Sequence, residues 1–188
     1  IEEQLRKGNM HNERHLWTSV RPNGPIRPYS LNRLEIRICD LISNCDLLIA
    51  ITALLELRII SLLNNLKMYD PIEASSENLD DLALLCDENE IQAAKNSLNS
   101  NLSHWKNGNQ INCRDWIREL VNDVTPLAEE LDMFDLLKPI ESVLKNGNQA
   151  MIWLDSYAKG TSIESVLQQS IREMEQEEST FFQMKSSD

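Results

Sequence analysis

The sequence predicts an α+β fold, in which a small antiparallel sheet near the N-terminus is followed by a mainly α-helical C-terminal part. Charged and aliphatic residues alternate over Arg33–Cys39, which is the two-residue period of a strand with one buried face. From Asp40 onward the apolar residues follow a helical period. A chain of 188 residues, 41% of them hydrophobic, can bury one sizeable core, so we expect one domain, with or without an appendage.

Two stretches are predicted as strands. HLWTSVR (His15–Arg21) alternates moderately and RLEIRIC (Arg33–Cys39) alternates strongly. The segment between them, residues 22–32, holds three prolines and a glycine and is expected to be a loop. An antiparallel pair is the simplest arrangement of the two strands. Trp17, Ser19 and Arg21 would then share one face.

The first predicted helix is the aliphatic run Leu47–Leu63, which Ser43, Asn44 or Asp46 can cap. A membrane span needs about 20 predominantly apolar residues, and here Glu56 and Arg58 interrupt the second half. We interpret the run as a buried helix that covers the apolar face of the sheet.

The remainder is predicted as a series of shorter amphipathic helices. Thr125-Pro126 is expected to start a helix as N-cap and first helical residue, Pro139 to start or kink one, and Gly160 with Ser162 to end one and cap the next. The expected helices span residues 77–86, 88–103, 113–123, 126–133, 135–145, 149–158 and 163–179. The expected organisation is the sheet strands and their covering helix in 1–66, a helical layer of the same domain in 67–180, and a flexible tail in 181–188.

The pentapeptide KNGNQ occurs twice, at Lys106–Gln110 and Lys145–Gln149. Glycine commonly ends a helix and asparagine commonly caps the next one. Both copies are therefore predicted to link two helices.

The net charge of −12 is distributed unevenly. Residues 1–40 hold seven basic and five acidic side chains, whereas residues 41–188 hold eleven and twenty-five. The acidic remainder would repel a polyanion, and no sustained aromatic-basic interleaving runs through the chain, so we exclude nucleic acid as a partner. A small anion is a better ligand for the basic part.

The cations between residues 14 and 37 are all arginines: Arg14, Arg21, Arg27, Arg33 and Arg37. The planar guanidinium group binds a carboxylate or phosphate in a bidentate geometry, which lysine cannot do. Arg33, Glu35 and Arg37 are expected on one face of their strand, with Arg27 in the loop. Scattered surface arginines are the alternative interpretation, and the alternation disfavours it.

Other candidate sites are weaker. His11 and His15 are four residues apart, but the HExxH pattern is incomplete and no third zinc ligand is evident. No GxSxG sequence and no glycine-rich phosphate loop occurs. The four scattered cysteines are expected to be reduced thiols of a cytoplasmic protein, with Cys39 either a redox-sensitive group or, preferably, a small buried side chain.

RLEIRICD, followed by a short polar turn and a long aliphatic helix, resembles the C-terminal portion of the glutamate-cysteine ligases of the glutamine-synthetase-like carboxylate-amine ligase superfamily. The preceding RHLWTSVRPNGPIRPYSLNR is similar to the cyanobacterial type. GNQAMIWLDSYAKGTSIESVLQQSIREM, further along, resembles the helical end of that family. The resemblance covers most of the chain and is most specific in residues 12–63.

The resemblance implies ATP-dependent joining of the glutamate γ-carboxyl to the cysteine amine through a γ-glutamyl phosphate, the first step of glutathione synthesis. It implies that Glu35 binds Mg²⁺, that Arg37 is catalytic and contacts the phosphoryl group, and that Arg33 lies near the nucleotide phosphates. Arg21 and Arg27 match substrate- or phosphate-binding positions less closely. ATP and Mg²⁺ are thus the expected cofactors, with glutamate and cysteine as substrates.

The resemblance implies that the family's other metal-binding carboxylates lie in an N-terminal half, which we expect to be missing from this chain. The chain also opens on IEEQLRKGN, which is typical of the middle of a helix. We therefore expect a fragment whose partner is the missing half and whose unpaired sheet edge invites association, including as a homo-oligomer. A related ligase with another amine acceptor and a noncatalytic helical interaction module remain alternatives.

Overall fold

The computed structural model describes residues 6–7, 20–23, 33–36, 42–65, 68 and 70–185, and in 20–23, 33–35, 71–72 and 181–185 the backbone alone. The chain divides into two compact units, residues 1–42 and 43–188, and each is described by itself. The first contains a two-stranded sheet, and the second is mainly helical with one further hairpin. The predicted α+β class is confirmed.

The sheet of the first unit pairs β1 (Val20–Asn23) with β2 (Arg33–Ile36) in antiparallel sense. The predicted pairing is confirmed within the described residues, where β1 extends two residues beyond the predicted end at Arg21. Residues 15–19 of the predicted strand lie outside the described part. Strand β1 includes Pro22. A proline is tolerated in an edge strand, because the N–H that it lacks is not needed there for pairing. The predicted loop residues 24–32 lie outside the described part.

Helix α2 (Cys45–Asn64) confirms the predicted aliphatic helix. Of the three candidate caps, Asn44 is the one that caps, since its Oδ1 accepts a hydrogen bond from the Leu47 N–H at 2.7 Å. Within the described residues, no helix combines the length and apolarity that a membrane span requires.

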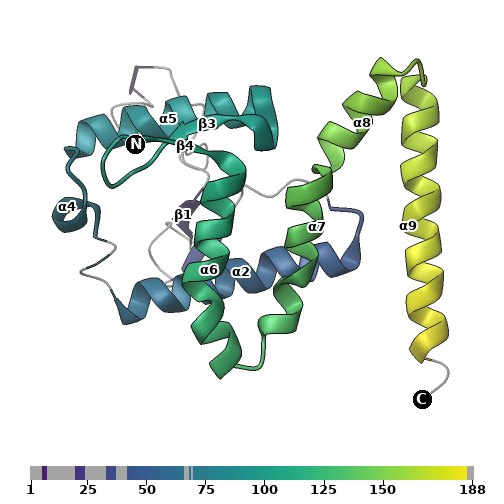
Figure 1. The fold of residues 1–188 in the computed structure, drawn as a ribbon, viewed down its shortest axis with the longest axis horizontal. Helices are drawn as coiled ribbons and strands as arrows, with labels where there is room; N and C mark the ends of the chain where they lie inside the picture. Colours follow the sequence, from purple (N-terminus) through teal and green to yellow (C-terminus); the bar gives the residue numbers. More distant parts are fainter. Residues whose placement is uncertain are drawn as a thin grey trace. The chain divides into compact units, whose positions relative to one another are not determined.

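One stripe of α2 enters the core of the second unit. Ala50, Ala53, Leu57 and Ser61 are buried at helical spacing, and the two alanines leave room for neighbouring helices. Helices α6 (Cys113–Glu130) and α7 (Lys138–Asn146) cross α2 and pack on it, as does the short η2 (Phe134–Leu137) (Figure 1). The core consists of Ala50, Ala53, Leu57, Leu98, Val124, Ala128, Leu137, Ile140 and Leu144.

Arg58, in the second half of α2, has an acidic partner on a neighbouring helix. Arg58 forms an ion pair with Asp123 of α6 at 3.5 Å. Leu48, Ile49 and Leu63, on other sides of α2, remain exposed. That the sheet covers α2 stays a prediction, since the two units are described separately.

The predicted helix break at Thr125-Pro126 is wrong. Both residues lie inside α6, which continues to Glu130. Pro126 removes one backbone N–H, but Val124 and Ala128 on either side of it are completely buried, and their burial favours a continuous helix. The Thr125 hydroxyl donates to the Val121 carbonyl at 2.8 Å instead of capping a new helix.

The predicted helices 77–86 and 88–103 are also wrong in their boundaries. The structure has one helix, α5 (Leu79–Asn96), after the short α4 (Pro71–Ala74). Ser97, with φ of 51°, ends α5 and begins the 3-10 turn η1 (Ser97–Asn99). Residues up to 103 then form a strand instead of the end of a helix.

That strand, β3 (Asn101–Ser103), pairs with β4 (Gln110–Asn112) in an antiparallel hairpin. The first KNGNQ copy therefore contains the hairpin turn, with Gly108 at φ of 64°, and does not link two helices as predicted. The second copy is confirmed as a helix link: Gly147 ends α7, and Asn148 caps α8 (Gln149–Ala158) by accepting from Met151 N–H at 3.1 Å.

The remaining boundary signals are confirmed. Pro139 lies in the first turn of α7. Gly160 follows α8 with φ of 95°, and the Ser162 hydroxyl accepts from Ser165 N–H at 3.2 Å at the start of α9 (Ile163–Lys185). Helix α9 continues to Lys185, beyond residue 181 where the sequence predicts a tail.

Candidate functional site

The sheet of the first unit contains three of the predicted site residues, Arg21, Arg33 and Glu35. The register pairs Arg21 with Glu35 and Asn23 with Arg33. Directly paired positions in an antiparallel ladder lie on the same face, and alternate positions share it. Positions 21, 23, 33 and 35 therefore occupy one face, and 20, 22, 34 and 36 the other.

The structure thus brings Arg21, Arg33 and Glu35 to a common face of the ladder. Arg27 and Arg37 lie outside the described residues, as do Cys39 and the histidine pair His11 and His15. On the opposite face, Ile36 is half-buried, which agrees with an apolar side of the sheet. The sequence alone did not indicate that Arg21 is the direct neighbour of Glu35, because this depends on the register.

The donor set on this face suits a phosphate and a hard cation. A carboxylate such as that of Glu35 is a ligand that Mg²⁺ prefers, and Mg²⁺ commonly takes only one or two carboxylates, with phosphate and water completing its shell. Arginines beside it would neutralise phosphate charge. Among the side chains that the structure describes, no group of three or more His, Cys, Asp or Glu could hold a metal ion by itself.

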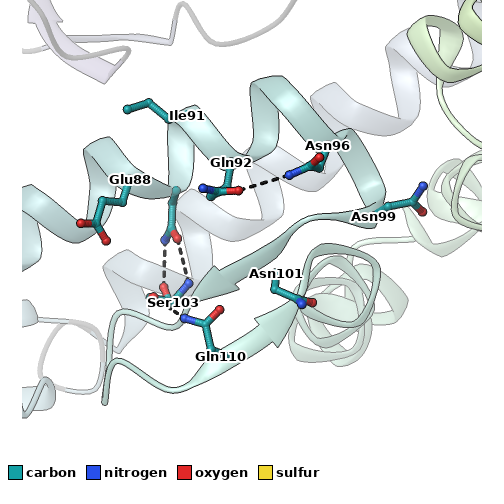
Figure 2. Close-up of a pocket in the computed structure, with 9 residues that line it drawn as sticks. Glu88, Ile91, Gln92, Asn96, Asn99, Asn101, Ser103 and Gln110 are labelled. Atoms are coloured by element: carbon teal, nitrogen blue, oxygen red, sulfur yellow. Dashed lines mark hydrogen bonds between the residues drawn. The ribbon is translucent and has the colours of Figure 1, made fainter.

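The second unit has a groove of about 740 Å³ between α5 and the β3–β4 hairpin (Figure 2). Six of its nine lining residues carry amide side chains. Both polar atoms of the Asn89 amide form hydrogen bonds with Ser103: Nδ2 donates to its carbonyl and Oδ1 accepts from its N–H, both at 2.8 Å. The lining residues are Glu88, Asn89, Ile91, Gln92, Asn96, Asn99, Asn101, Ser103 and Gln110.

This groove does not resemble a nucleotide phosphate site. Its lining has no cation, and Glu88 is its one charged residue. Amides offer both donors and acceptors without net charge, so the groove suits an uncharged polar ligand better than a phosphate. Sequence reasoning missed it because β3 was predicted as the end of a helix and β4 as part of a link between helices.

A second groove, of about 570 Å³, lies between α6 and α7 and has an apolar floor that includes Val121, Ile140 and Leu144. Its two cations are already paired. Arg118 contacts Asp115 at 2.8 Å and Lys138 contacts Asp135 at 2.7 Å. Neither groove therefore has an unpaired arginine among its lining residues.

An aromatic cluster surrounds His104 next to the hairpin turn. Its ring lies 5.0 Å from the Trp116 ring and 6.1 Å from the Trp105 ring, measured between centroids. Its Nδ1 accepts from the Lys106 N–H at 3.2 Å, which requires an unprotonated Nδ1. Burial lowers the pKa of His104, nearby Glu119 and Asp123 oppose this, and Lys106 reinforces it.

We expect the free energy of unfolding to decrease as the pH falls below about 6.5, the unfolded pKa of histidine. A histidine whose pKa is lowered by folding contributes fully above its unfolded pKa of about 6.5, and the contribution is lost as the pH falls from there through the lowered value. His104→Asn keeps an acceptor near the Nδ1 position and does not titrate. Urea unfolding of both proteins at pH 7.5 and at several lower values should show a steeper loss in the wild type. Equal pH dependence of the two proteins would contradict the assignment.

The chain is similar to known proteins over most of its length. A family model described as glutamate-cysteine ligase family 2 matches residues 1–179. A protein of Herpetosiphon aurantiacus named "Putative glutamate–cysteine ligase 2" is 25% identical over 169 residues, which is 90% of this chain. The match covers 41% of that relative, so the chain spans well under half the length of the curated relative that it matches.

Proposed function

The chain belongs to glutamate-cysteine ligase family 2, and on this basis we propose that it contributes part of the active site of an ATP-dependent glutamate-cysteine ligase. The observation that carries the proposal is the family match over residues 1–179, which includes both strands of the sheet. The register supports it, because it gives Glu35 two arginines on its own face. This is the combination that the resemblance implies for the site.

The proposed reaction has two steps. The γ-phosphoryl group of ATP passes to the γ-carboxylate of glutamate, forming γ-glutamyl phosphate and ADP. The cysteine amine then attacks the acyl carbon, an amide bond forms, and inorganic phosphate leaves while the amine loses a proton. Neither step needs a covalent protein nucleophile. Positioning and charge neutralisation are what the protein must supply.

Each proposed residue has a role in that neutralisation. Arg37 would contact the phosphoryl group that is transferred, and Arg33 the nucleotide phosphates, with Arg21 and Arg27 as further contacts to substrate or phosphate. Glu35 would provide an oxygen ligand for Mg²⁺, and the ion, when bound, supplies positive charge to the phosphate oxygens. The remaining Mg²⁺ ligands would come from water, phosphate and protein segments other than this strand.

The test of the function is ADP release that depends on both glutamate and cysteine in a complete enzyme that contains this chain. Replacing cysteine by a panel of other amines distinguishes the related ligase with another acceptor. ADP release that requires neither glutamate nor an amine would contradict the proposal. The expected partners are glutamate, cysteine and ATP.

Glu35→Gln tests the metal role in the same enzyme. The substitution keeps the shape of the side chain and removes its charge, so the Mg²⁺ concentration for half-maximal rate should rise and nucleotide binding should weaken. Thermal stability should change little, because a cross-strand charge pair contributes only about 0.2–1 kcal/mol. The measurement is a Mg²⁺ titration of the rate.

The same register favours one alternative, in which Arg21 and Glu35 form a structural ion pair in a noncatalytic module. Glu35→Gln would then lower stability slightly and leave the Mg²⁺ titration unshifted. Glu56→Gln, on the exposed side of α2, is a matched control that should change neither quantity.

A further inference from the structure

The groove between α5 and the β3–β4 hairpin has rows of polar side chains on both of its walls (Figure 2). On α5, Glu88, Gln92 and Asn96 are spaced four residues apart, so they form one stripe along the helix. At 1.5 Å per residue this stripe is about 12 Å long. All three residues are exposed. The helix wall is therefore a polar stripe that a ligand can reach.

The hairpin wall is one face of the two-stranded sheet. Asn101 and Ser103 are alternate residues of β3, and Gln110 of β4 is the direct partner of Ser103, so the three share that face. The hydrogen bond from Gln110 Nε2 to Ser103 Oγ, at 2.8 Å, agrees with this placement. Leu102, between the two β3 residues, is buried. Strand alternation thus turns polar side chains into the groove and the leucine away from it.

Asn89 shows which chemistry these amide side chains suit. Its Nδ2 donates to the Ser103 carbonyl, and its Oδ1 accepts from the N–H of the same residue. One amide side chain therefore satisfies both backbone groups of one residue in an extended chain, as a neighbouring strand would. The other amides of the groove have the same donor and acceptor atoms, and can pair with peptide groups in the same way.

Several of these amide atoms form no hydrogen bond with another described residue. Gln92 Oε1 accepts from Asn96 Nδ2 at 3.2 Å, which leaves Gln92 Nε2 as a donor and Asn96 Oδ1 as an acceptor. Gln110 donates through Nε2, which leaves its Oε1 as an acceptor. The amide of Asn101 keeps both its donor and its acceptor for a ligand. Both walls therefore offer hydrogen-bonding groups that are not used within the described fold.

We propose that this groove binds a short, extended and uncharged peptide segment, whose backbone groups pair with the amides of Gln92, Asn101 and Gln110. An extended chain rises about 3.3 Å per residue, so a stripe of about 12 Å accommodates about four residues. The nine lining residues include no cation to bind a carboxylate or phosphate, and no aromatic side chain on which a sugar ring could stack. The inference concerns the second unit alone and is independent of the proposed ligase reaction.

The first experiment titrates the 188-residue chain with a probe that offers peptide groups without charge, N-acetylated and C-amidated Ala-Ser-Ala-Ser. In amide correlation NMR spectra, the side-chain signals of Gln92, Asn101 and Gln110 should shift until they saturate. The signal of Gln168, an exposed amide of α9, should not shift. The absence of a saturable shift at millimolar peptide would overturn the proposal. Maltose, an uncharged disaccharide, is titrated in parallel, and an affinity equal to that of the peptide would overturn the peptide assignment.

The second experiment removes amides from the hairpin wall. Asn101→Leu combined with Gln110→Met keeps the approximate shape of each side chain, and both positions are exposed, so the fold should be retained. The affinity for the peptide should fall about tenfold, as expected for the loss of two neutral hydrogen bonds. Gln168→Met, outside the groove, is the matched control and should bind like the wild type.

A third variant tests the opposite wall without changing the hairpin. Gln92→Met on α5 should weaken binding about fivefold, because one hydrogen bond to the peptide is lost. The backbone signal of the buried Val124 verifies that the core is intact in every variant. Wild-type affinity in Gln92→Met and in the double variant would overturn the site.

Discussion

Arg37→Lys is expected to reduce turnover of the complete enzyme by about two orders of magnitude or more while the fold is retained. Lysine keeps the positive charge but presents a point charge in place of the planar fork, so it cannot hold two phosphoryl oxygens at once. Loss of one preorganised charge contact in an active site typically costs about 10²–10³-fold in rate. The resemblance gives Arg37 this role, and the described residues of β2 end one position before it.

The measurement is the steady-state rate of ADP release with glutamate and cysteine, together with the circular dichroism spectrum to verify folding. Arg172→Lys is the matched control, because Arg172 is an exposed arginine of α9 that contacts Gln169 at 3.0 Å. The control should retain normal turnover. A near-normal rate in Arg37→Lys, with unchanged ATP and glutamate requirements, would remove Arg37 from the site.

The second large effect concerns the 188-residue chain on its own, which is expected to show no ligase turnover. The proposed site has a single carboxylate on the sheet, and one carboxylate leaves most of the Mg²⁺ shell to water. The chain also spans only 41% of its curated relative, so the relative's remaining length is available to supply further ligands. Among the described residues of the first unit, each strand of the two-stranded sheet also has an unpaired edge that invites association.

The isolated chain should nevertheless be folded. The second unit has its own core around Leu57, Val124 and Ala128, all completely buried. Circular dichroism should therefore report a predominantly helical protein even though activity is absent. Mixing the chain with the N-terminal half of a family member should restore ADP release that depends on glutamate and cysteine. Robust turnover by the isolated chain would show that its site is complete and that the fragment interpretation is wrong.

Elements with a strong local signal are predicted well from the sequence. The alternation of Arg33–Ile36 identifies a strand, and the aliphatic run after Asn44 identifies a helix that begins with a side-chain cap. The second KNGNQ copy marks the end of α7 and the start of α8. In each case the deciding interaction lies within a few residues of the position it determines.

Where distant residues compete with local preference, the local signal fails. Pro126 is a strong helix-start signal, yet the burial of Val124 and Ala128 against the rest of the core keeps α6 continuous. The first KNGNQ copy has the same letters as the second, but its glycine lies in a hairpin turn. That hairpin is fastened to α5 through Asn89 and Ser103.

For the candidate site, the sequence by itself determined that Arg33 and Glu35 share one face of a strand, because this follows from the two-residue period alone. That Arg37 lies on the same face stays a prediction, since it lies outside the described residues. The tertiary structure decided that Arg21 is the direct neighbour of Glu35 and that Glu177 reaches the start of α2. The physical reason is the separation along the sequence over which each kind of interaction acts. Strand alternation and helix caps are set by adjacent backbone geometry, whereas strand register and a contact over 132 residues depend on how the whole chain packs.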